Sequence, residues 1–115
     1  MNGSREEDLA LRYLQARGLE LVERNVRAKG GELDLVMRDS SATLVIVEVR
    51  KRAHRAFGTA AESVDARKQR RIVQAARSLL ARRPELARLP ARFDVIALDA
   101  DDRIDWIQAA FDASD

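Results

Sequence analysis

Two strand-like stretches, each with one carboxylate in an apolar pattern, constrain this chain more than any other feature. The first covers residues 32–37 and contains Asp34, and the second covers residues 44–50 and contains Glu48. In both, side-chain character alternates with a period of two, which predicts β-strands. The intervening residues include Asp39, Ser40 and Ser41, which favour a turn. The sequence therefore predicts an antiparallel hairpin.

The register of this hairpin decides whether the two carboxylates meet. A pairing in which opposed residue numbers sum to an even value near 82 places Asp34 and Glu48 on one face, with Cβ atoms about 4.5 to 8 Å apart. Such carboxylates repel each other unless a proton, a basic side chain or a cation lies between them. Mg²⁺ suits this gap because it takes oxygen ligands from one or two carboxylates plus water. The alternatives are an ion pair between Glu48 and Arg50, or carboxylates on the solvent side of a half-exposed sheet.

Length and composition limit the classes of protein that this chain can represent. Its 115 residues suit one domain, residues 1–115, and there is no cysteine and a single histidine, His54. Disulfides, thiolate zinc sites and cysteine nucleophiles are thereby excluded. The first residues lack the pattern of a signal peptide, and no apolar run approaches the roughly 20 residues of a membrane helix. We expect a cytoplasmic protein with no membrane partner.

Positive charge is concentrated in the first four fifths of the chain. All but one of the 21 lysine and arginine residues precede residue 93, whereas residues 93–115 hold seven of the 19 acidic residues. The planar guanidinium group matches phosphate geometry, so the basic clusters predict nucleic-acid contacts. A solvated surface that reflects compositional bias is the alternative. The predicted contact residues are Arg50, Lys51, Arg52, His54, Arg55, Arg67, Arg70 and Arg71.

Hydrophobic spacing predicts two helices and three further strands. A helix over residues 5–17 starts with a capping box of Ser4 and Glu7 and ends at Gly18. An amphipathic helix over residues 64–82 is stopped before Pro84, with Lys68 on or beside its buried stripe. The further strands are expected at residues 19–26, 92–99 and 103–108, with a loop at 53–63 and a connector at 84–90. The order αβββαββ predicts an α/β fold with a central mixed sheet flanked by helices.

Read in a row, these segments resemble the YraN family, a small bacterial group. The resemblance covers nearly the whole chain and rests on EDLALRYLQARG, ERNVRAKGGELDLVMRD, VIVEVRKR, AFG, ARKQRRIVQAA and RFDVIALD. That family is similar to the restriction-endonuclease-like superfamily and to archaeal Holliday-junction resolvases, whose motif is a helix glutamate, a strand aspartate and Glu-x-Lys. The resemblance implies a restriction-endonuclease-like fold, with Glu7, Asp34 and Glu48 as ligands of Mg²⁺ or Mn²⁺.

One position departs from that motif, because Arg50 stands where the resemblance implies a lysine. Arginine keeps its proton and cannot act as a general base, although it can stabilise developing phosphate charge. Strand alternation points Lys51 to the opposite face, so Lys68 is the stand-in that we consider. Glu7 has an alternative role in the capping box, and Glu6 replaces the glycine that usually precedes it. The catalytic candidates are Asp34, Glu48, Arg50 and Lys68.

Three functions stay open from the sequence. The first is a Mg²⁺-dependent endonuclease that acts on structured or branched DNA. The second is a nucleic-acid-binding module with a nuclease-like fold that has lost turnover through Arg50. The third is a scaffold protein that uses its acidic C-terminal segment and Trp106 as the contact. A homodimer is also left open, and without a recognition helix or an aromatic stacking motif no sequence preference is predicted.

Overall fold

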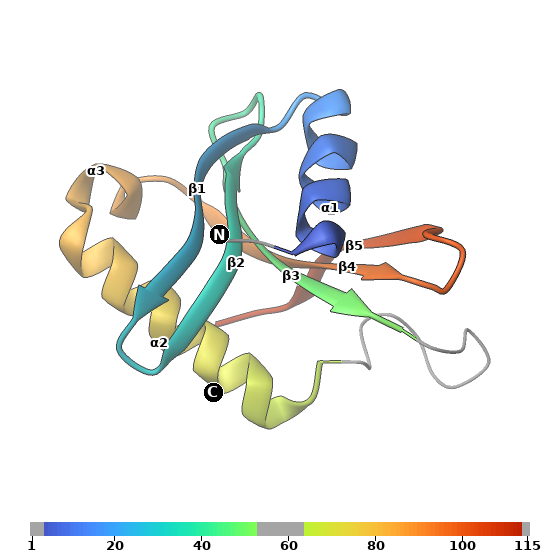
Figure 1. Cartoon of the computed structure of the whole chain (residues 1–115). Helices are drawn as coiled ribbons and strands as arrows, with labels where there is room; N and C mark the ends of the chain where they lie inside the picture. Colours follow the sequence, from blue (N-terminus) through green and yellow to red (C-terminus); the bar gives the residue numbers. More distant parts are fainter. Residues whose placement is uncertain (1–3, 53–63, 114–115) are drawn as a thin grey trace.

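A computed structural model describes residues 4–52 and 64–113, and these residues have the α/β architecture that the sequence predicts (Figure 1). The αβββαββ order is confirmed, with two differences. A short helix lies in the predicted connector, where Pro84 occupies a first-turn position, and the last strand extends to Phe111. The elements are α1 (Arg5–Ala16), β1 (Glu20–Ala28), β2 (Gly31–Arg38), β3 (Leu44–Lys51), α2 (Ala66–Arg82), α3 (Pro84–Ala87), β4 (Ala91–Leu98) and β5 (Ile104–Phe111).

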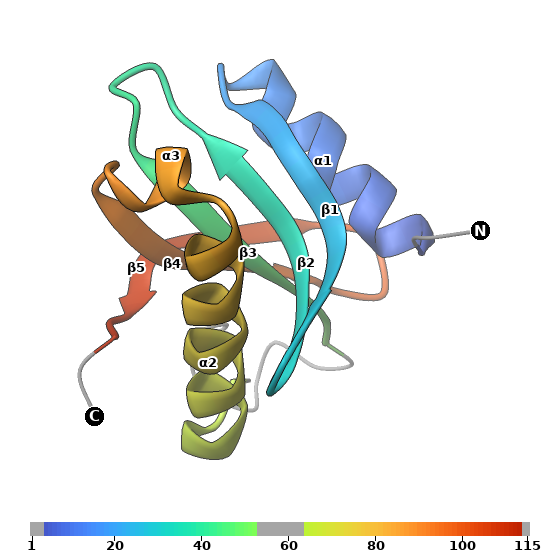
Figure 2. The ribbon, with the colours of Figure 1, turned by 90° about the vertical axis from the view of Figure 1, so that its left-hand side faces the viewer.

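The five strands form one mixed sheet in the order β1-β2-β3-β4-β5. Neighbours pair antiparallel except β3 and β4, which are parallel because α2 and α3 carry the chain back between them. Helix α1 covers one face of the sheet and α2 covers the other (Figures 1 and 2). The central strands are therefore buried on both faces, which explains why β3 is apolar at nearly every position.

Each face of the sheet has its own apolar core. Ala10 and Leu14 of α1 pack against Leu35, Met37 and strand residues of β3 and β4. On the other face, the buried stripe of α2 packs against alternate positions of the same strands. That second core includes Val36, Leu44, Ile46, Ile72, Val73, Ala76, Leu79, Phe93 and Val95.

The β2–β3 turn and the β4–β5 turn are built in the same way around an aspartate. The Asp39 Oδ1 atom accepts the backbone N–H groups of Ser41 and Thr43, both at 2.9 Å. The Asp99 Oδ1 atom accepts the N–H groups of Asp101 and Arg103, at 2.8 and 3.0 Å. Aspartate side chains commonly hold turns through such local hydrogen bonds. The predicted turn at residues 39–41 is thus confirmed, and the carboxylates of Asp39 and Asp99 have structural roles.

The β1–β2 turn lies against α2 at close range. Gly30 has a φ of +98°, and a Cβ atom there would lie 2.7 Å from the Gln74 Oε1 atom and 2.9 Å from the Gln74 Cβ atom. A Cβ atom on Gly31 would lie 3.2 Å from the carbonyl oxygen of Arg71. The glycine pair therefore permits the hairpin tip to pack on the first half of α2, which sets the position of that helix over the sheet.

Asp94 is a buried carboxylate whose partners are all structural. It is 0% exposed in β4, and it accepts N–H groups from the Trp106 indole at 2.9 Å, the Ala109 backbone at 2.9 Å and the Arg92 guanidinium at 3.1 Å. These bonds join β4 to β5 where their register shifts between Phe93 and Val95. They also account for the extension of β5 beyond the predicted end at residue 108. In the described parts of the chain, no helix has the length and apolar character needed to cross a membrane.

Candidate functional site

Strands β2 and β3 separate at the position of the two predicted carboxylates. Their pairing runs from Arg38↔Leu44 to Leu35↔Val47, so that opposed numbers sum to 82 as predicted. Beyond that last pair, β2 continues beside β1 as far as Gly31, and β3 continues beside β4 as far as Lys51. Figure 1 shows the two strand ends diverging. Asp34 and Glu48, the next residue on each strand, lie where the strands part.

The two carboxylates contact each other directly. The Asp34 Oδ2 atom accepts the backbone N–H of Val49 at 2.9 Å, which holds its side chain across the opening toward β3. The Glu48 side chain is hydrogen-bonded to Asp34 and is only 5% exposed. The predicted shared face and short separation are confirmed.

Burial and the neighbouring carboxylate change the protonation of Glu48. Desolvation, followed by the charge and the hydrogen bond of Asp34, raises the pKa of Glu48 to about 8, against the opposing effects of Lys68 and Arg50. Below a pH of about 8, the buried Glu48 carboxyl therefore favours its protonated form. A bound cation would supply the same positive charge and displace that proton.

Two cationic side chains approach the same oxygen of Glu48. The Lys68 Nζ atom lies 3.6 Å and the Arg50 Nη1 atom 3.8 Å from the Glu48 Oε2 atom. Lys68 comes from the first turn of α2, whose N-terminus is capped by the Asp65 side chain accepting the Lys68 backbone N–H at 2.9 Å. The ion pair between Glu48 and Arg50 that the sequence allows is thus present. Lys68, which lies 20 residues after Glu48 in the sequence, approaches the same Glu48 oxygen.

Glu7 lies beside this pair and also caps α1. The Ser4 hydroxyl accepts the Glu7 backbone N–H at 3.1 Å, and the Glu7 carboxylate accepts the backbone N–H of Ser4 and a hydrogen bond from Asn25. Burial and the charge of Asp34 raise the pKa of Glu7. Its Oε1 atom is buried without a hydrogen-bond partner among the described residues, 3.6 Å from the Arg24 guanidinium. The capping-box role is confirmed, and Glu7 is also close enough to Asp34 to respond to its charge.

The donor set fits a hard divalent cation held by few protein ligands. Within residues 4–52 and 64–113, no three His, Cys, Asp or Glu side chains gather closely enough to hold a metal ion. The structure instead brings together the pair Asp34 and Glu48, and Mg²⁺ is commonly bound by one or two carboxylates with water completing its shell. The role of Glu7 as a ligand stays a prediction.

The two predicted basic clusters converge beside the carboxylates. Arg50, Arg67, Lys68 and Arg71 line one open hollow of about 340 Å³, together with the capping Asp65. Four cations around a small hollow are suited to an anionic group such as phosphate. Arg70 lies one helix turn from Arg67 on the same exposed side of α2.

The remaining predicted contacts lie elsewhere. The Arg52 guanidinium is 2.9 Å from Asp105 of β5 and only 11% exposed, so it is committed to an ion pair within the fold. Lys51 is exposed and lies near Asp102 at the β4–β5 turn, away from the carboxylates, as strand alternation predicts. The hydrogen bond from Arg5 lowers the pKa of Asp102, and the charge of Lys51 adds to this effect. His54 and Arg55 fall outside the described residues.

Trp106, the contact considered for a scaffold protein, is partly buried in the fold. Its indole N–H is bonded to Asp94, and its ring lies edge-on to Tyr13 with centroids 6.2 Å apart. This position joins β5 to α1, so the structure gives Trp106 an internal role.

Two groups at the site escaped the sequence reasoning. Because the helix was predicted to start at residue 64, Asp65 was not identified as the N-cap residue of α2, whose side chain accepts the backbone N–H of Lys68. An Asp before an amphipathic run is an N-cap signal that identifies this residue. The Val49 backbone N–H has no side-chain signature, because it becomes available to Asp34 only where β2 and β3 separate.

Comparisons with known proteins give both close relatives and distant structural likenesses. The sequence model of "Uncharacterised protein family UPF0102" matches residues 6–98. A UPF0102 protein of Cupriavidus taiwanensis is 57% identical over 112 residues, covering 96% of this chain and 82% of the relative. A UPF0102 protein of Ralstonia pickettii is 58% identical over 113 residues, covering 95% and 88%.

Among solved structures, two longer chains are similar to this one. The EndoMS-dsDNA2 complex matches with a TM-score of 0.46 and 17% identity over 86% of this chain and 37% of that chain. A repair endonuclease from Pyrococcus abyssi matches with a TM-score of 0.45 and 18% identity over 89% and 41%. This chain spans less than half the length of both.

Proposed function

Because the chain belongs to the uncharacterised family UPF0102, whose name assigns no activity, we propose a function from its site: a metal-dependent endonuclease acting on structured or branched DNA. Membership of this family confirms the resemblance to the YraN family. One observation carries the proposal. A buried Glu48 is bonded to Asp34 and is approached by Lys68 and Arg50, beside a hollow lined by arginines.

Asp34 and Glu48 are the residues that would hold Mg²⁺ or Mn²⁺. When bound, such an ion activates a water molecule and neutralises charge on the phosphate that is attacked. The fold places the two carboxylates so close together that a positive charge is needed to relieve their repulsion, and this favours binding of the ion. The Val49 backbone N–H fixes one oxygen of Asp34 at the opening between β2 and β3.

The basic side chains have separate roles in the proposal. Lys68 is within 3.6 Å of Glu48 and can hydrogen-bond the attacking water or the scissile phosphate. Arg50, at 3.8 Å, stays protonated and stabilises the charge that develops on the phosphate oxygens. Arg67 and Arg71 then position the phosphates on either side of the cleaved bond.

A cleavage assay with a matched control tests the proposal. Linear, single-stranded, flapped and four-way DNA are incubated with Mg²⁺ or Mn²⁺ and either wild type, Glu48→Gln or Glu32→Gln. Glu32 is an exposed carboxylate on the same strand as Asp34, so its substitution controls for a general loss of negative charge. We expect cleavage of branched DNA by wild type and Glu32→Gln, and a loss of at least about 100-fold with Glu48→Gln. Equal cleavage by all three proteins would identify a contaminant.

The alternative function is a binding module with the same fold and no turnover. The observation that favours it is Arg50 at the position where the resemblance implies lysine. Under this alternative, wild type binds branched DNA and cuts none of the substrates with either metal. The proximity of Lys68 to Glu48 supports the active enzyme.

A further inference from the structure

The exposed side of α2 carries a stripe of basic residues that the helix itself does not need. Residues 67, 70, 71, 74 and 77 recur at helical spacing and are exposed, and four of them are arginines. Helix α2 contains six basic residues and no acidic residue over Ala66–Arg82. Basic groups in a first turn oppose the helix dipole, which favours negative charge there. The stripe is therefore better explained by an anionic partner than by helix stability.

Three neighbouring hollows lie along this stripe, and each shares lining residues with the next. We call these three hollows together the path. The hollow beside Glu48 shares Arg67 and Arg71 with a second hollow of about 630 Å³, which adds Arg70, Gln74 and Arg77. The second hollow shares Val73 and Arg77 with a third of about 680 Å³. From Lys68 to Arg77 the path is about 14 Å long at 1.5 Å per helical residue. That is about four phosphates at the spacing of a duplex strand, and fewer for an extended strand.

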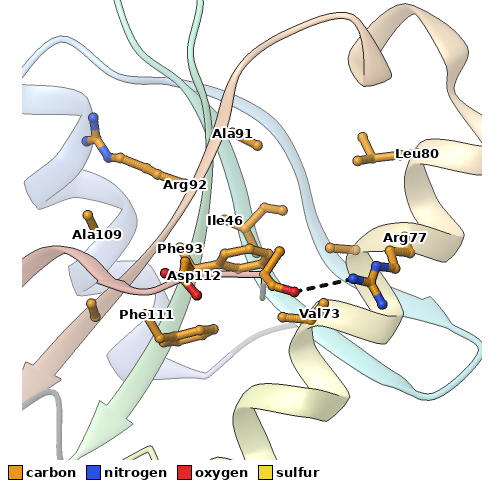
Figure 3. Close-up of a pocket in the computed structure, with 13 residues that line it drawn as sticks. Ile46, Val73, Arg77, Leu80, Ala91, Arg92, Phe93, Ala109, Phe111 and Asp112 are labelled. Carbon is orange, nitrogen blue, oxygen red and sulfur yellow. Dashed lines mark hydrogen bonds between the residues drawn. The ribbon is translucent and has the colours of Figure 1, made fainter. Parts of the chain in front are cut away.

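The third hollow differs chemically from the first two (Figure 3). Its lining is mostly apolar and includes Phe111, whose ring is stacked on Phe93 with centroids 5.1 Å apart and an angle of 17°. Arg77 lies on the α2 side, with its guanidinium 3.3 Å from the carbonyl oxygen of Ala113. Arg92 also lines the hollow, but its guanidinium bonds Asp94 and pairs with Asp39. Asp112 contributes a carboxylate at the junction with the second hollow.

An apolar hollow with an aromatic stack suits a nucleobase and does not suit a phosphate. A base can place its face on an aromatic ring only when it is unpaired and unstacked from its neighbours. The arginine stripe, by contrast, suits a phosphate backbone. The order of features along the path is therefore carboxylates, phosphate contacts and then a base-sized apolar hollow.

We propose that this path binds an unpaired DNA strand that leaves the carboxylate site along α2 and places one base in the hollow at Phe111. The substrate is then DNA with a single-stranded arm next to the cleaved position, and an uninterrupted duplex is a poor ligand. The inference rests on the proposed function for the location of the cleaved phosphate. Binding of the arm itself requires only α2 and the Phe111 hollow.

Binding without cleavage tests this inference. Anisotropy titrations in chelator, with the Glu48→Gln protein, compare a blunt duplex with the same duplex carrying a short DNA arm. We expect the arm to increase affinity by about tenfold or more, as one stacked base can. Substituting both Arg70 and Arg77 by alanine should remove this gain, so that the armed and the blunt duplex bind with equal affinity. Arg82→Ala, at the far end of α2 in a separate hollow, should change neither affinity.

Phe111→Leu tests the base contact and should lower the arm-dependent gain about tenfold. If this variant loses thermal stability, an arm with a photoreactive thymine is crosslinked to wild type and the peptide is mapped. Crosslinks within residues 107–113 support the inference, whereas crosslinks confined to other segments overturn it. A larger gain from an RNA arm than from a DNA arm would overturn the assignment to DNA.

The two proposals fail in different ways. Arm-dependent binding without any cleavage rejects the endonuclease and leaves the strand path intact. Cleavage of blunt and armed DNA at equal rates, with no gain in affinity from the arm, rejects the strand path and leaves the endonuclease intact.

Discussion

The pKa of Glu48 depends on several groups that act in opposite directions, and most of them are distant in the sequence. It is buried, bonded to one carboxylate and approached by Lys68 and Arg50 on a single oxygen. Burial and the neighbouring carboxylate outweigh the two cations, since the net effect is a raised pKa. The fold therefore holds two carboxylates that repel each other at the point where a cation would bind. Strongly shifted pKa values of this kind are typical of functional sites.

The first prediction follows from the raised pKa of Glu48. The folded value is about 8 and the ordinary value is 4.5, so the folded state binds this proton more tightly than the unfolded state. The contribution of the Glu48 proton to the free energy of unfolding is fully present below pH 4.5 and is lost as pH rises through about 8. In chelator, the free energy of unfolding should fall across this window by up to about 1.4 kcal/mol per pH unit.

Urea unfolding at several pH values measures this slope. Glu48→Gln should flatten it, because glutamine does not titrate. Glu85→Gln is the matched control, since Glu85 is exposed and ion pairing with Arg83 lowers its pKa, placing its contribution below this window. An unchanged slope in Glu48→Gln would show that other groups cause the pH dependence.

The second prediction concerns which basic side chain acts in cleavage. Lys68→Ala should lower the cleavage rate about 10²-fold or more with little loss of DNA affinity, because the group acts mainly in the transition state. Arg50→Lys should be tolerated, and Lys51→Ala serves as control because Lys51 lies away from the carboxylates. Single-turnover rates and equilibrium affinities are measured together.

Other outcomes of the same experiment are equally informative. If wild type is inactive, Arg50→Lys is expected to restore weak metal-dependent cleavage, since it returns a lysine to the position beside Glu48. An active wild type that is indifferent to Lys68→Ala, Arg50→Ala and Lys51→Ala alike would show that none of these side chains is catalytic.

At the scale of elements, the site depends on where α2 lies over the opening between β2 and β3. The last pair between these strands is Leu35↔Val47, and the hydrogen bond from Val49 to Asp34 takes the place of further pairing. Helix α2 brings Lys68 to this opening because its N-terminus is capped at Asp65 and its first half packs on the β1–β2 turn. A shift of α2 would therefore separate Lys68 from Glu48.

The third prediction tests the packing of that turn on α2. Gly30→Ala introduces both an unfavourable positive φ and a contact of 2.7 Å with Gln74. Gly18→Ala introduces a similar φ of +90° with nothing within 4 Å. We expect Gly18→Ala to cost about 1 kcal/mol of stability, and Gly30→Ala to cost about 1 to 3 kcal/mol more. Denaturant unfolding measures both, and equal costs would show that the close approach to α2 is not constrained.

At the scale of the whole molecule, charge is segregated. All but one of the basic residues lie before residue 93, whereas the last 23 residues hold seven acidic residues and one basic residue. In the fold, Asp102 and Asp105 near the β4–β5 turn are paired with Arg5 and Arg52. Arg50, Arg67, Lys68 and Arg71 instead surround the hollow beside Glu48. In the described part of the chain, a basic region thus lies at the carboxylate pair.

The fourth prediction is that DNA binding at this basic region depends steeply on salt. Each neutralised phosphate contributes about −0.9 to the slope of log affinity against log salt, so four contacts predict a slope of about −3 to −4. Replacing Arg67 and Arg71 together by alanine should make the slope less negative by about 2. Anisotropy titrations over a salt series measure it, and binding that is independent of salt would reject the basic region as the contact surface.

The sequence alone determined the local elements, because their signals are local. Period-two alternation, the Ser4–Glu7 capping box and the turn at residues 39–41 each depend on neighbours within a few residues. The register of the β2–β3 hairpin could also be predicted from the sequence, since a shift by one residue would expose an apolar face. Together these signals predicted the mixed sheet and the meeting of Asp34 with Glu48.

Tertiary structure alone decided how that carboxylate pair is surrounded. Glu48 and Asp94 look alike in sequence, each a carboxylate in an apolar strand, yet Asp94 receives three N–H donors and Glu48 faces another carboxylate. Which partners a buried charge meets depends on segments far apart in the chain, such as α2 with Lys68. Those distances are set by the packing of the helices on the two faces of the sheet, and no local pattern encodes them.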